Sequence, residues 1–198
     1  MDVVVPELAI HQHDARGLHE QRQDVLSVYS DANADRLDDP FYSLSRYWER
    51  LLAYASRDGF GFVTGRLGTE LVGYALGYPL PAGSGWWHGI RGEVDQALLT
   101  ETGQRTFAFN ELMVRPQWRR RGYASALHDA LLRSRPEARA ALLVRPDNTA
   151  AHHAYRSWGW YKIGELQPFD DAPIFDAMVR ESHKQADPLG GRSEGNDG

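Results

Sequence analysis

Residues 110–124 read NELMVRPQWRRRGYA, an apolar strand pattern that runs through a loop into the start of a helix. Three consecutive arginines, Arg119, Arg120 and Arg121, stand at that start, where each cation opposes the helix macrodipole by about 0.3 to 1 kcal/mol. An anion bound there would explain the arrangement, because first-turn amides and guanidinium groups could share it. Gly122 would let the backbone approach such a ligand closely. The alternative is a solvated basic turn beside acidic neighbours.

The glycine pattern narrows the kind of anion. A Walker loop needs Gly, four residues, Gly, Lys and then Ser or Thr, and the sequence has no such run. Gly59, Gly61 and Gly65 miss the spacing of a dinucleotide-binding loop and lie within a strand pattern. The sequence therefore indicates neither ATP nor NAD.

Arg119, Gly122 and Ala124 form the pattern Q/R-x-x-G-x-G/A, which resembles the coenzyme A signature of the GNAT superfamily of N-acetyltransferases. In that family the signature follows a strand that ends in a hydrophobic-Val-x-Pro pattern, here Met113 to Pro116, and it opens a helix. Two motifs in the family's order are more specific than one. The second motif, Asn, Ala and Tyr before aromatic-Gly-aromatic, appears as Asn148, Ala151, Tyr155, Trp158, Gly159 and Trp160, with Trp where the family usually has Phe.

The resemblance covers Phe60 to Val179 and is strongest over Phe107 to Trp160. It implies an α/β (α+β) fold: one domain with a central mixed, mostly antiparallel sheet flanked by helices. It also implies acetyl-CoA as co-substrate, with the acetyl group passed directly to a primary amine in a ternary complex.

In the family, the strands that match Phe107–Val114 and Ala140–Val144 splay apart, and the pantetheine arm lies in the gap. Pairing with the arm would resemble the addition of a strand to a sheet edge. The resemblance gives these cofactor-binding residues: Leu112, Met113 and Val114 through their backbone, then Arg119, Arg120, Arg121, Gly122, Tyr123, Ala124, Asn148, Ala151 and Tyr155.

The second motif is consistent with one helical face. Asn148, Ala151 and Tyr155 are spaced by three and then four residues, and the small Ala151 leaves room for a ligand. The family tyrosine lies near the sulfur, which implies that Tyr155 donates a hydrogen bond to the leaving thiolate. A phenol with a pKa of about 10 is a weaker acid than a thiol at about 8.5, so Tyr155 should mainly stabilise the developing charge. The ordinary alternative is an N-cap at Asn148 and a core residue at Tyr155.

Glu111 is the candidate that holds the amine or its proton. A lysine-like amine with a pKa of about 10.4 needs roughly 4.6 kcal/mol to become neutral at pH 7, so a base or a water relay is useful. Some family members, notably aminoglycoside acetyltransferases, carry an acidic residue at the matching place. A carboxyl near a pKa of about 4.3 is a poor base unless burial or a relay water helps. Alternatively, Glu111 is an exposed strand residue or the partner of an arginine.

Further helices and strands follow from periodicity, caps and breakers. The stretch Gly83–Gly103 is the least regular. The predicted elements are strands at Val3–Leu8, Phe60–Thr64, Leu71–Tyr78, Thr106–Val114, Ala140–Val144, Trp160–Leu166 and Ile174–Val179, and helices at Asp14–Tyr29, from Ser45 to before Gly59, at Glu93–Leu99, Arg121–Ser134 and Asn148–Trp158.

Composition excludes several classes of protein and site. The chain has 198 residues, a net charge of −5 and 42% hydrophobic residues, which predicts one mildly acidic domain, residues 1–180, and a disordered polar tail, residues 181–198. Zero Cys rules out disulfides and a thiol nucleophile, and no His spacing predicts a metal site. The net charge disfavours nucleic acid as a partner. We expect a cytoplasmic monomer or homodimer, without a secretory signal or a membrane span.

The acceptor and the catalytic status stay open at this point. A net-acidic chain mildly favours a cationic small molecule, such as an aminoglycoside or a polyamine, or else a peptide N-terminus or lysine. A non-catalytic CoA-binding sensing or interaction module on the same fold is the alternative. Aromatic residues that could wall an acceptor pocket, or simply belong to the core, are Tyr42, Tyr47, Trp48, Trp86 and Trp87.

Overall fold

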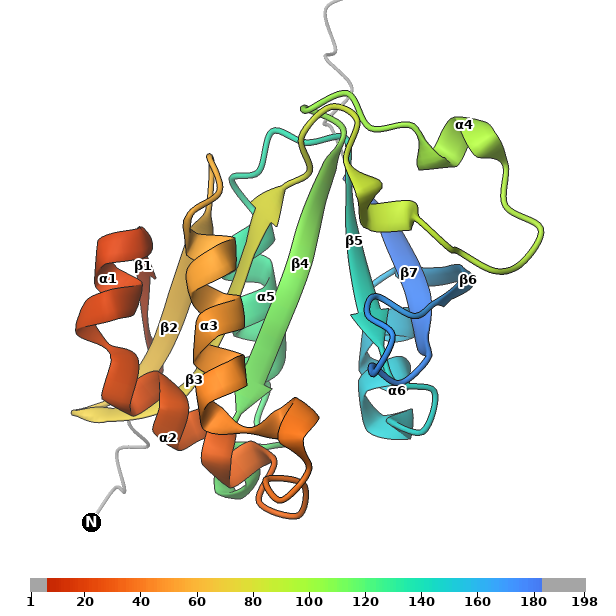
Figure 1. The fold of residues 1–198 in the computed structure, drawn as a ribbon. Helices are drawn as coiled ribbons and strands as arrows, with labels where there is room; N and C mark the ends of the chain where they lie inside the picture. Colours follow the sequence, from red (N-terminus) through yellow and green to blue (C-terminus); the bar gives the residue numbers. More distant parts are fainter. Residues whose placement is uncertain (1–6, 183–198) are drawn as a thin grey trace, which may run out of the picture.

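A seven-stranded sheet runs through the computed structural model, which describes residues 7–182 (Figure 1). The strand order is β1-β2-β3-β4-β5-β7-β6, and β4 with β5 is the parallel pair among antiparallel neighbours. This confirms the expected mixed, mostly antiparallel sheet within a single domain. The strands are β1 (Ala9–His13), β2 (Gly61–Leu67), β3 (Glu70–Pro79), β4 (Thr106–Val114), β5 (Arg139–Val144), β6 (Tyr161–Leu166) and β7 (Phe175–Glu181).

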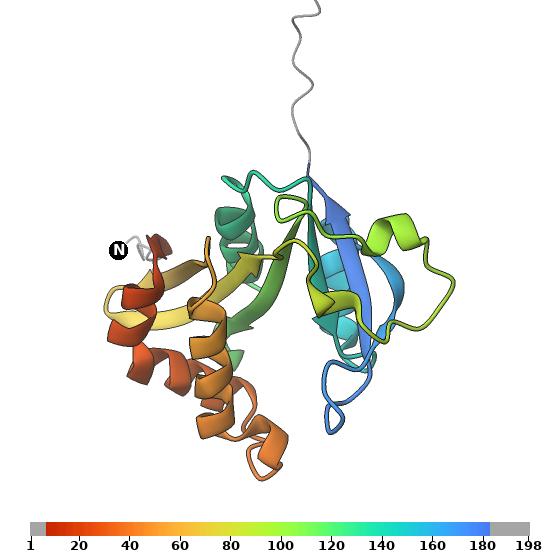
Figure 2. The ribbon, with the colours of Figure 1, turned by 45° about the horizontal axis from the view of Figure 1, so that its top comes forward.

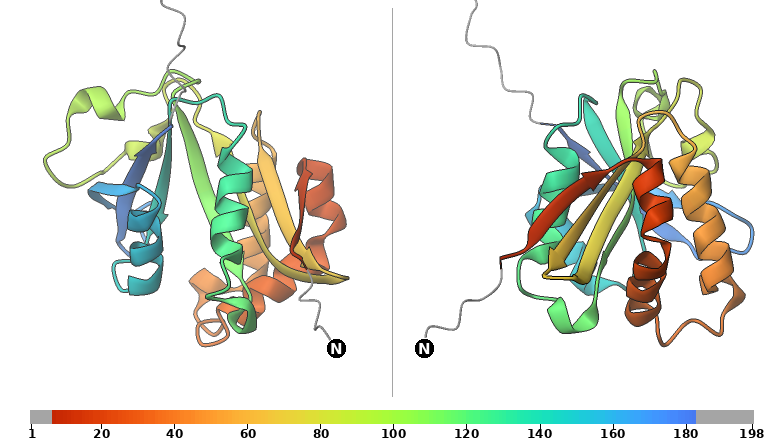
Figure 3. Two further views of the ribbon diagram at one scale, coloured as in Figure 1. Left: turned by 180° about the vertical axis from the view of Figure 1, so that it is seen from behind. Right: turned by 90° about the vertical axis from the view of Figure 1, so that its left-hand side faces the viewer.

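Helices cover both faces of this sheet. The first three helices pack on one face, and α5 and α6 pack on the other, where they flank the middle of the sheet (Figure 3). Each face has its own apolar core. The helices are α1 (Ala15–Glu20), α2 (Arg22–Ala32), α3 (Leu44–Ala55), α4 (Gln96–Leu99), α5 (Tyr123–Leu132) and α6 (Thr149–Ser157), with short 3-10 turns η1 (Pro40–Tyr42), η2 (Gly85–Trp87) and η3 (Pro116–Trp118).

The sheet opens between β4 and β5. These strands pair only where Thr106–Ala108 meets Arg139–Ala141. Beyond that point β4 continues along β3 and β5 continues along β7, so the two halves of the sheet diverge in a V (Figure 1). The lower part of β4 therefore has no neighbouring strand on its β5 side. The splay implied by the family resemblance is present.

A β-bulge in β4 changes which face its side chains occupy. Leu76 pairs with Glu111 and Gly77 pairs with Phe109, so Asn110 is the extra residue. Strict alternation would put Phe109 and Glu111 on one face. Instead Phe109 packs in the core under α5, whereas Met113, two residues beyond Glu111, packs in the core under α2 and α3. The bulge thus directs Glu111 toward α2 and α3.

The N-terminal part of the chain differs from its prediction. The first described strand is Ala9–His13, later than the expected Val3–Leu8, whose first four residues lie outside the described part. Its residues are largely exposed and lack an apolar alternation, so only pairing with β2 identifies this edge strand. The single helix expected after Asp14 is broken at Gln21, because that side chain bonds back to Gly17 O and to the His13 ring.

The C-terminal boundary is also later than expected. Glu181 ends β7, and the Ser182 N–H donates to Ala138 O at 2.9 Å. The predicted tail is therefore wrong for its first two residues, and its remainder, residues 183–198, lies outside the described part of the chain.

The irregular segment between β3 and β4 is fastened to the sheet by a buried polar network. The Trp87 indole N–H donates to Glu101 Oε1 at 2.7 Å, and Arg139 Nη2 lies 3.1 Å from the same oxygen. Thr106 Oγ1 joins them at 2.9 Å. Of the helix expected at Glu93–Leu99, only α4 forms. The network fixes η2 beside the opening of the V.

No described helix has both the length and the hydrophobicity needed to span a membrane. No group of three or more described His, Asp or Glu side chains lies close enough together to bind a metal ion.

Candidate functional site

A cleft of about 750 Å³ occupies the opening of the V. α3 and the loop between β6 and β7 lie on opposite sides of this opening (Figure 2). Backbone and side chains of β4 form part of its wall, and α6 contributes another part. The predicted site residues that line it are Glu111, Leu112, Met113, Asn148, Ala151 and Tyr155.

The remaining predicted residues do not line the cleft: Val114 is the last residue of β4, and the others stand at or just before the start of α5. The helix begins at Tyr123, later than the expected Arg121, and Gly122 is its N-cap with a φ of 80°. No side chain caps this end, and a Cβ built on Gly122 meets nothing within 4 Å. The first-turn amides therefore have no side-chain acceptor among the described residues. Space and donors for an anion are both present at this end of α5.

The three arginines have different surroundings. Arg119 Nε donates to Val114 O at 3.2 Å, which ties the loop to the end of β4. Arg121 stacks 5.0 Å above the Trp118 ring. Arg120 has a φ of 60°, a left-handed conformation that is uncommon for a residue with a side chain. All three are exposed, and none forms an ion pair within residues 7–182. Their charge is thus available to a ligand.

α6 is positioned by its first residue. Asn148 Oδ1 accepts a hydrogen bond from the Ala151 N–H at 3.1 Å, so Asn148 is an N-cap, the ordinary alternative noted above. Two turns later, the Tyr155 ring packs edge-on against Trp158 and Trp160 at centroid distances of 5.7 and 5.8 Å. The helix and these rings fix the Tyr155 side chain at the cleft wall.

The Tyr155 hydroxyl has the properties of a hydrogen-bond donor to a ligand. It makes no hydrogen bond to any residue that the structure describes. Burial, and secondarily the nearby Glu111 carboxylate, raises the pKa of Tyr155 well above its usual value. The phenol therefore keeps its proton throughout the physiological range.

Glu111 is a largely buried carboxyl group beside an arginine. Its side chain is only 11% exposed, and burial raises the pKa of its carboxyl to about 7. Arg50 opposes this shift, with Nε 3.7 Å from Glu111 Oε1. Of the two alternatives raised from the sequence, the arginine partner is present, whereas Glu111 is not an exposed strand residue. Near pH 7 the group can both accept and release a proton.

A cluster of buried tyrosines surrounds Arg50 and packs α2 against α3 and the sheet. The Tyr47 and Tyr74 hydroxyls are 2.6 Å apart, and the Tyr29 ring stacks on Tyr47 at 3.6 Å. Arg50 lies over the Tyr47 ring at 5.1 Å. Burial raises the pKa values of these phenols, and the carboxylate of Glu111 adds to the rise for Tyr47 and Tyr74. The cluster remains neutral and fixes the geometry around Glu111.

Arg50 and Asn110 line the cleft but are not among the site residues predicted from the sequence, although each interrupts a local hydrophobic pattern. Arg50 lies three residues after Tyr47 and four before Tyr54, on the apolar face of a predicted helix, where a charge is unusual. Asn110 and Glu111 are adjacent polar residues in an otherwise apolar strand, a break in alternation typical of a bulge. Of the aromatic candidates, Tyr42 and Trp86 line the cleft, whereas Tyr47, Trp48 and Trp87 are buried in cores.

The ion pair gives a direct prediction. In Arg50→Gln the positive charge that lowers the pKa of Glu111 is absent, so we expect that pKa to rise above about 7. A carbon-detected NMR titration of the Glu111 carboxyl measures this. Arg46→Gln, on the same helix but paired with Asp171, should leave it unchanged. A fall of the Glu111 pKa in Arg50→Gln would contradict the assignment.

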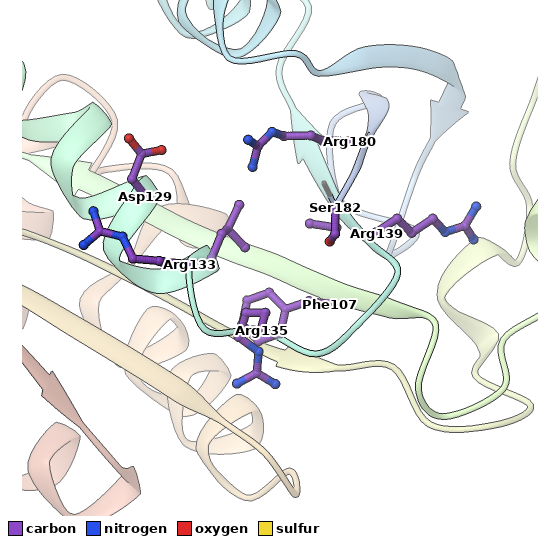
Figure 4. Close-up of a pocket in the computed structure, with 9 residues that line it drawn as sticks. Phe107, Asp129, Arg133, Arg135, Arg139, Arg180 and Ser182 are labelled. Carbon is purple, nitrogen blue, oxygen red and sulfur yellow. The ribbon is translucent and has the colours of Figure 1, made fainter. Parts of the chain in front are cut away.

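A second cavity, of about 390 Å³, lies on the side of the sheet that carries α5, near the closed end of the V. Arg133, Arg135 and Arg139 contribute to its wall, but their guanidinium groups point in different directions (Figure 4). Arg135 pairs with Glu137 and Arg139 with Glu101. The cavity therefore lacks a convergent set of donors for an anion.

The sequence profile of the Acetyltransferase (GNAT) family matches residues 23–160. Comparison with curated proteins finds no match. Among solved structures, PH1933 from Pyrococcus horikoshii OT3 is similar, with 16% identity, a TM-score of 0.63, and coverage of 88% of this chain and 99% of that one.

Two further structures share the fold. The PaiA N-acetyltransferase from Thermoplasma acidophilum, in complex with coenzyme A, has 10% identity and a TM-score of 0.55 over 89% of this chain and 99% of that one. The ribosomal-protein-S18-alanine N-acetyltransferase from Escherichia coli has 15% identity and a TM-score of 0.59 over 88% and 94%. At these identities the likeness concerns the fold alone.

Proposed function

Since the chain belongs to the GNAT family of acetyltransferases, we propose that it transfers an acetyl group from acetyl-CoA directly to a primary amine. One observation carries this proposal: Glu111 and Tyr155 line the same cleft, beside the stretch of β4 that has no neighbouring strand. The Glu111 carboxyl, which can take up a proton near pH 7, and the neutral Tyr155 hydroxyl thus face the same cleft.

The residues present fit acetyl-CoA. Backbone groups of Leu112, Met113 and Val114, on the open side of β4, would pair with the pantetheine amides as a strand does. The uncapped start of α5 at Gly122 would bind the diphosphate. Its positive charge would come from Arg119, Arg120 and Arg121, and its N–H donors from the backbone amides of Tyr123 and Ala124. When bound, acetyl-CoA supplies the acetyl group in the activated form of a thioester.

Glu111 would prepare the amine for attack. The acceptor arrives as an ammonium ion, and the ionised Glu111 carboxylate takes one proton from it, directly or through a water molecule. A carboxyl with a pKa of about 7 is a better base for an amine than one near the usual value of about 4.3. Burial of Glu111 thus reduces the cost of producing the neutral amine.

Transfer then exchanges one bond for another. The nitrogen lone pair forms the new C–N bond while the C–S bond breaks and its electron pair goes to sulfur. The Tyr155 hydroxyl donates a hydrogen bond to that sulfur and stabilises the thiolate as its charge develops. The amide nitrogen loses its surplus proton, so that ammonium and thioester give amide, thiol and one proton in total.

Tyr155→Phe should lower kcat by about 10- to 100-fold, because it removes one hydrogen bond to a charged group. The ring contacts with Trp158 and Trp160 remain, so the affinity for acetyl-CoA should stay nearly constant. Steady-state CoA release together with calorimetric titration measures both quantities. An unchanged kcat would remove the role proposed for Tyr155.

The acceptor class proposed from this site is a primary amine of a small molecule, such as an aminoglycoside- or polyamine-like cation, or of a peptide or protein. A CoA-release screen over polyamines, aminoglycosides, amino acids and peptide N-termini tests the activity. Acetyl-CoA binding by calorimetry without CoA release from any amine would favour a non-catalytic CoA-binding sensing or interaction module.

The acetyltransferase domain, predicted as residues 1–180, extends at its C-terminal end through Ser182. We expect it to act as a monomer or homodimer, without nucleic acid or membrane partners. The zero cysteine content suits the reducing cytoplasm, which we propose as its compartment.

A further inference from the structure

Two buried polar atoms of residues that line the cleft have no hydrogen-bond partner among the described residues. They are Asn110 Oδ1, which can only accept a hydrogen bond, and Trp86 Nε1, which can only donate one. Both residues line the cleft. Buried polar groups are nearly always paired in native proteins, so each unpaired atom indicates a partner that a ligand would supply.

The first atom indicates where an amine binds. Asn110 immediately precedes Glu111 at the bulge, and both residues line the cleft. The amide oxygen of Asn110 is buried and accepts no hydrogen bond from a described residue, so it is left for a donor on a ligand. An ammonium group has three donors and no acceptor. The oxygen atoms of Asn110 and Glu111 together match that donor set.

The second atom lies in a region of positive charge. Trp86 packs with Tyr78 and Tyr54, whose rings are 5.6 Å apart, and Arg57 lies 5.8 Å over the Tyr78 ring. Arg57 is exposed and forms no ion pair with a residue between 7 and 182. The indole N–H and the guanidinium group thus both belong to the surroundings of Tyr78, and both are donors suited to an anionic oxygen.

Most of the arginines that line the cleft are already paired. Arg36 lies 3.7 Å from Asp35, Arg50 pairs with Glu111, and Arg145 pairs with Asp147. Among the lining arginines, Arg57 alone has no ion pair to a residue that the structure describes. Its charge would attract an anionic group and repel a second positive charge on the acceptor.

We infer that the preferred acceptor is an amine that also carries a carboxylate or a similar anionic group, and not a polycation. The ammonium end would lie between Asn110 Oδ1 and Glu111, and the anionic end near Trp86 Nε1 and Arg57. The rings of Tyr54 and Tyr78 would contact the body of the molecule between them. This inference rests on the proposed acetyl transfer and narrows its range of acceptors.

Matched acceptors test the inference. We would compare kcat/KM for para-(aminomethyl)benzoate and its carboxamide, which share the reacting amine and the ring, with spermidine as a polycation. The carboxylate should be preferred over its carboxamide by about tenfold or more, the effect of one charge-assisted hydrogen bond. Spermidine should react more slowly than either compound.

Two variants locate the anionic end. Arg57→Gln should remove most of the preference for the carboxylate, because it should lower kcat/KM for the carboxylate much more than for the carboxamide. Trp86→Phe, which loses only the indole N–H, should reduce the preference several-fold. Arg22→Gln is the matched control, because Arg22 also lies over an aromatic ring, 5.3 Å from Trp48, but does not line the cleft. It should retain the full preference.

The possible outcomes separate the two levels of the proposal. Equal rates with carboxylate and carboxamide, or faster reaction of spermidine, would overturn the inference and leave acetyl transfer standing. A preference that survives Arg57→Gln would also overturn the placement of the anionic end. If no amine in the panel releases CoA, the proposed function fails and the inference fails with it.

Discussion

Glu111→Gln is expected to lower kcat/KM at pH 8 by about 100- to 10,000-fold, the range that general base catalysis contributes. The amide keeps the size of the carboxyl group but cannot take a proton from the ammonium ion. The affinity for acetyl-CoA should be nearly unchanged, because pairing along β4 uses the backbone of neighbouring residues. Calorimetry and steady-state CoA release separate the two effects.

The pH profile makes this result specific. Glu111 must be ionised to act as a base, and burial raises its pKa to about 7, so the wild-type rate should rise with pH through about 7. That rise should be absent from Glu111→Gln and intact in Glu49→Gln, which changes an exposed carboxylate on α3. A rise near pH 7 that persists in Glu111→Gln would show that another group is the base.

Gly122→Val is expected to weaken acetyl-CoA binding by more than about 100-fold, the loss of two charge-assisted hydrogen bonds. The residue has a φ of 80°, and a Cβ there meets no protein atom within 4 Å. The added side chain would therefore occupy the space through which the diphosphate reaches the first-turn amides of α5. Calorimetric titration with acetyl-CoA measures the loss.

The strain of a side chain at a positive φ has to be separated from that effect. Gly68, in the turn between β2 and β3, has a φ of 58° and equally open surroundings, and it does not line the cleft. Gly68→Val should therefore cost a similar amount of folding stability, about 1 to 2 kcal/mol, and keep normal acetyl-CoA binding. Equal binding by both variants would refute the proposed diphosphate site.

The segment from Thr106 to Trp160 was predictable because its hydrophobic pattern, its cap and breaker residues and the family motifs all indicate the same strands and helices. The strand at Thr106–Val114 was predicted with the bounds that the structure shows, and Pro116 ends it as expected. The N-cap at Asn148 and the helical spacing to Tyr155 are local features that a sequence displays directly. The family motifs lie in this same region, so fold and cofactor site could be predicted together.

Other features depend on contacts that no local pattern encodes. The edge strand Ala9–His13 owes its conformation to pairing with β2, and the break at Gln21 follows from bonds to Gly17 and the His13 ring. The acceptor side of the cleft combines residues of α3, η2 and the β6–β7 loop, which are distant in the sequence. Net charge alone weakly favours a cationic acceptor, whereas the anionic group that we infer on the amine depends on Arg57 and the Trp86 indole, which only the folded chain places at one cleft.

The extra residue in β4 has a consequence for mutational tolerance. Phe109 and Glu111 lie on opposite faces because Asn110 is not counted in the pairing with β3. Loss of the codon for Asn110 would make these two residues neighbours in a strictly alternating strand, so both would keep their faces. Gain of a codon beside Asn110 would not be absorbed in this way. Insertions are therefore expected to be tolerated less well than a deletion at this point of the strand.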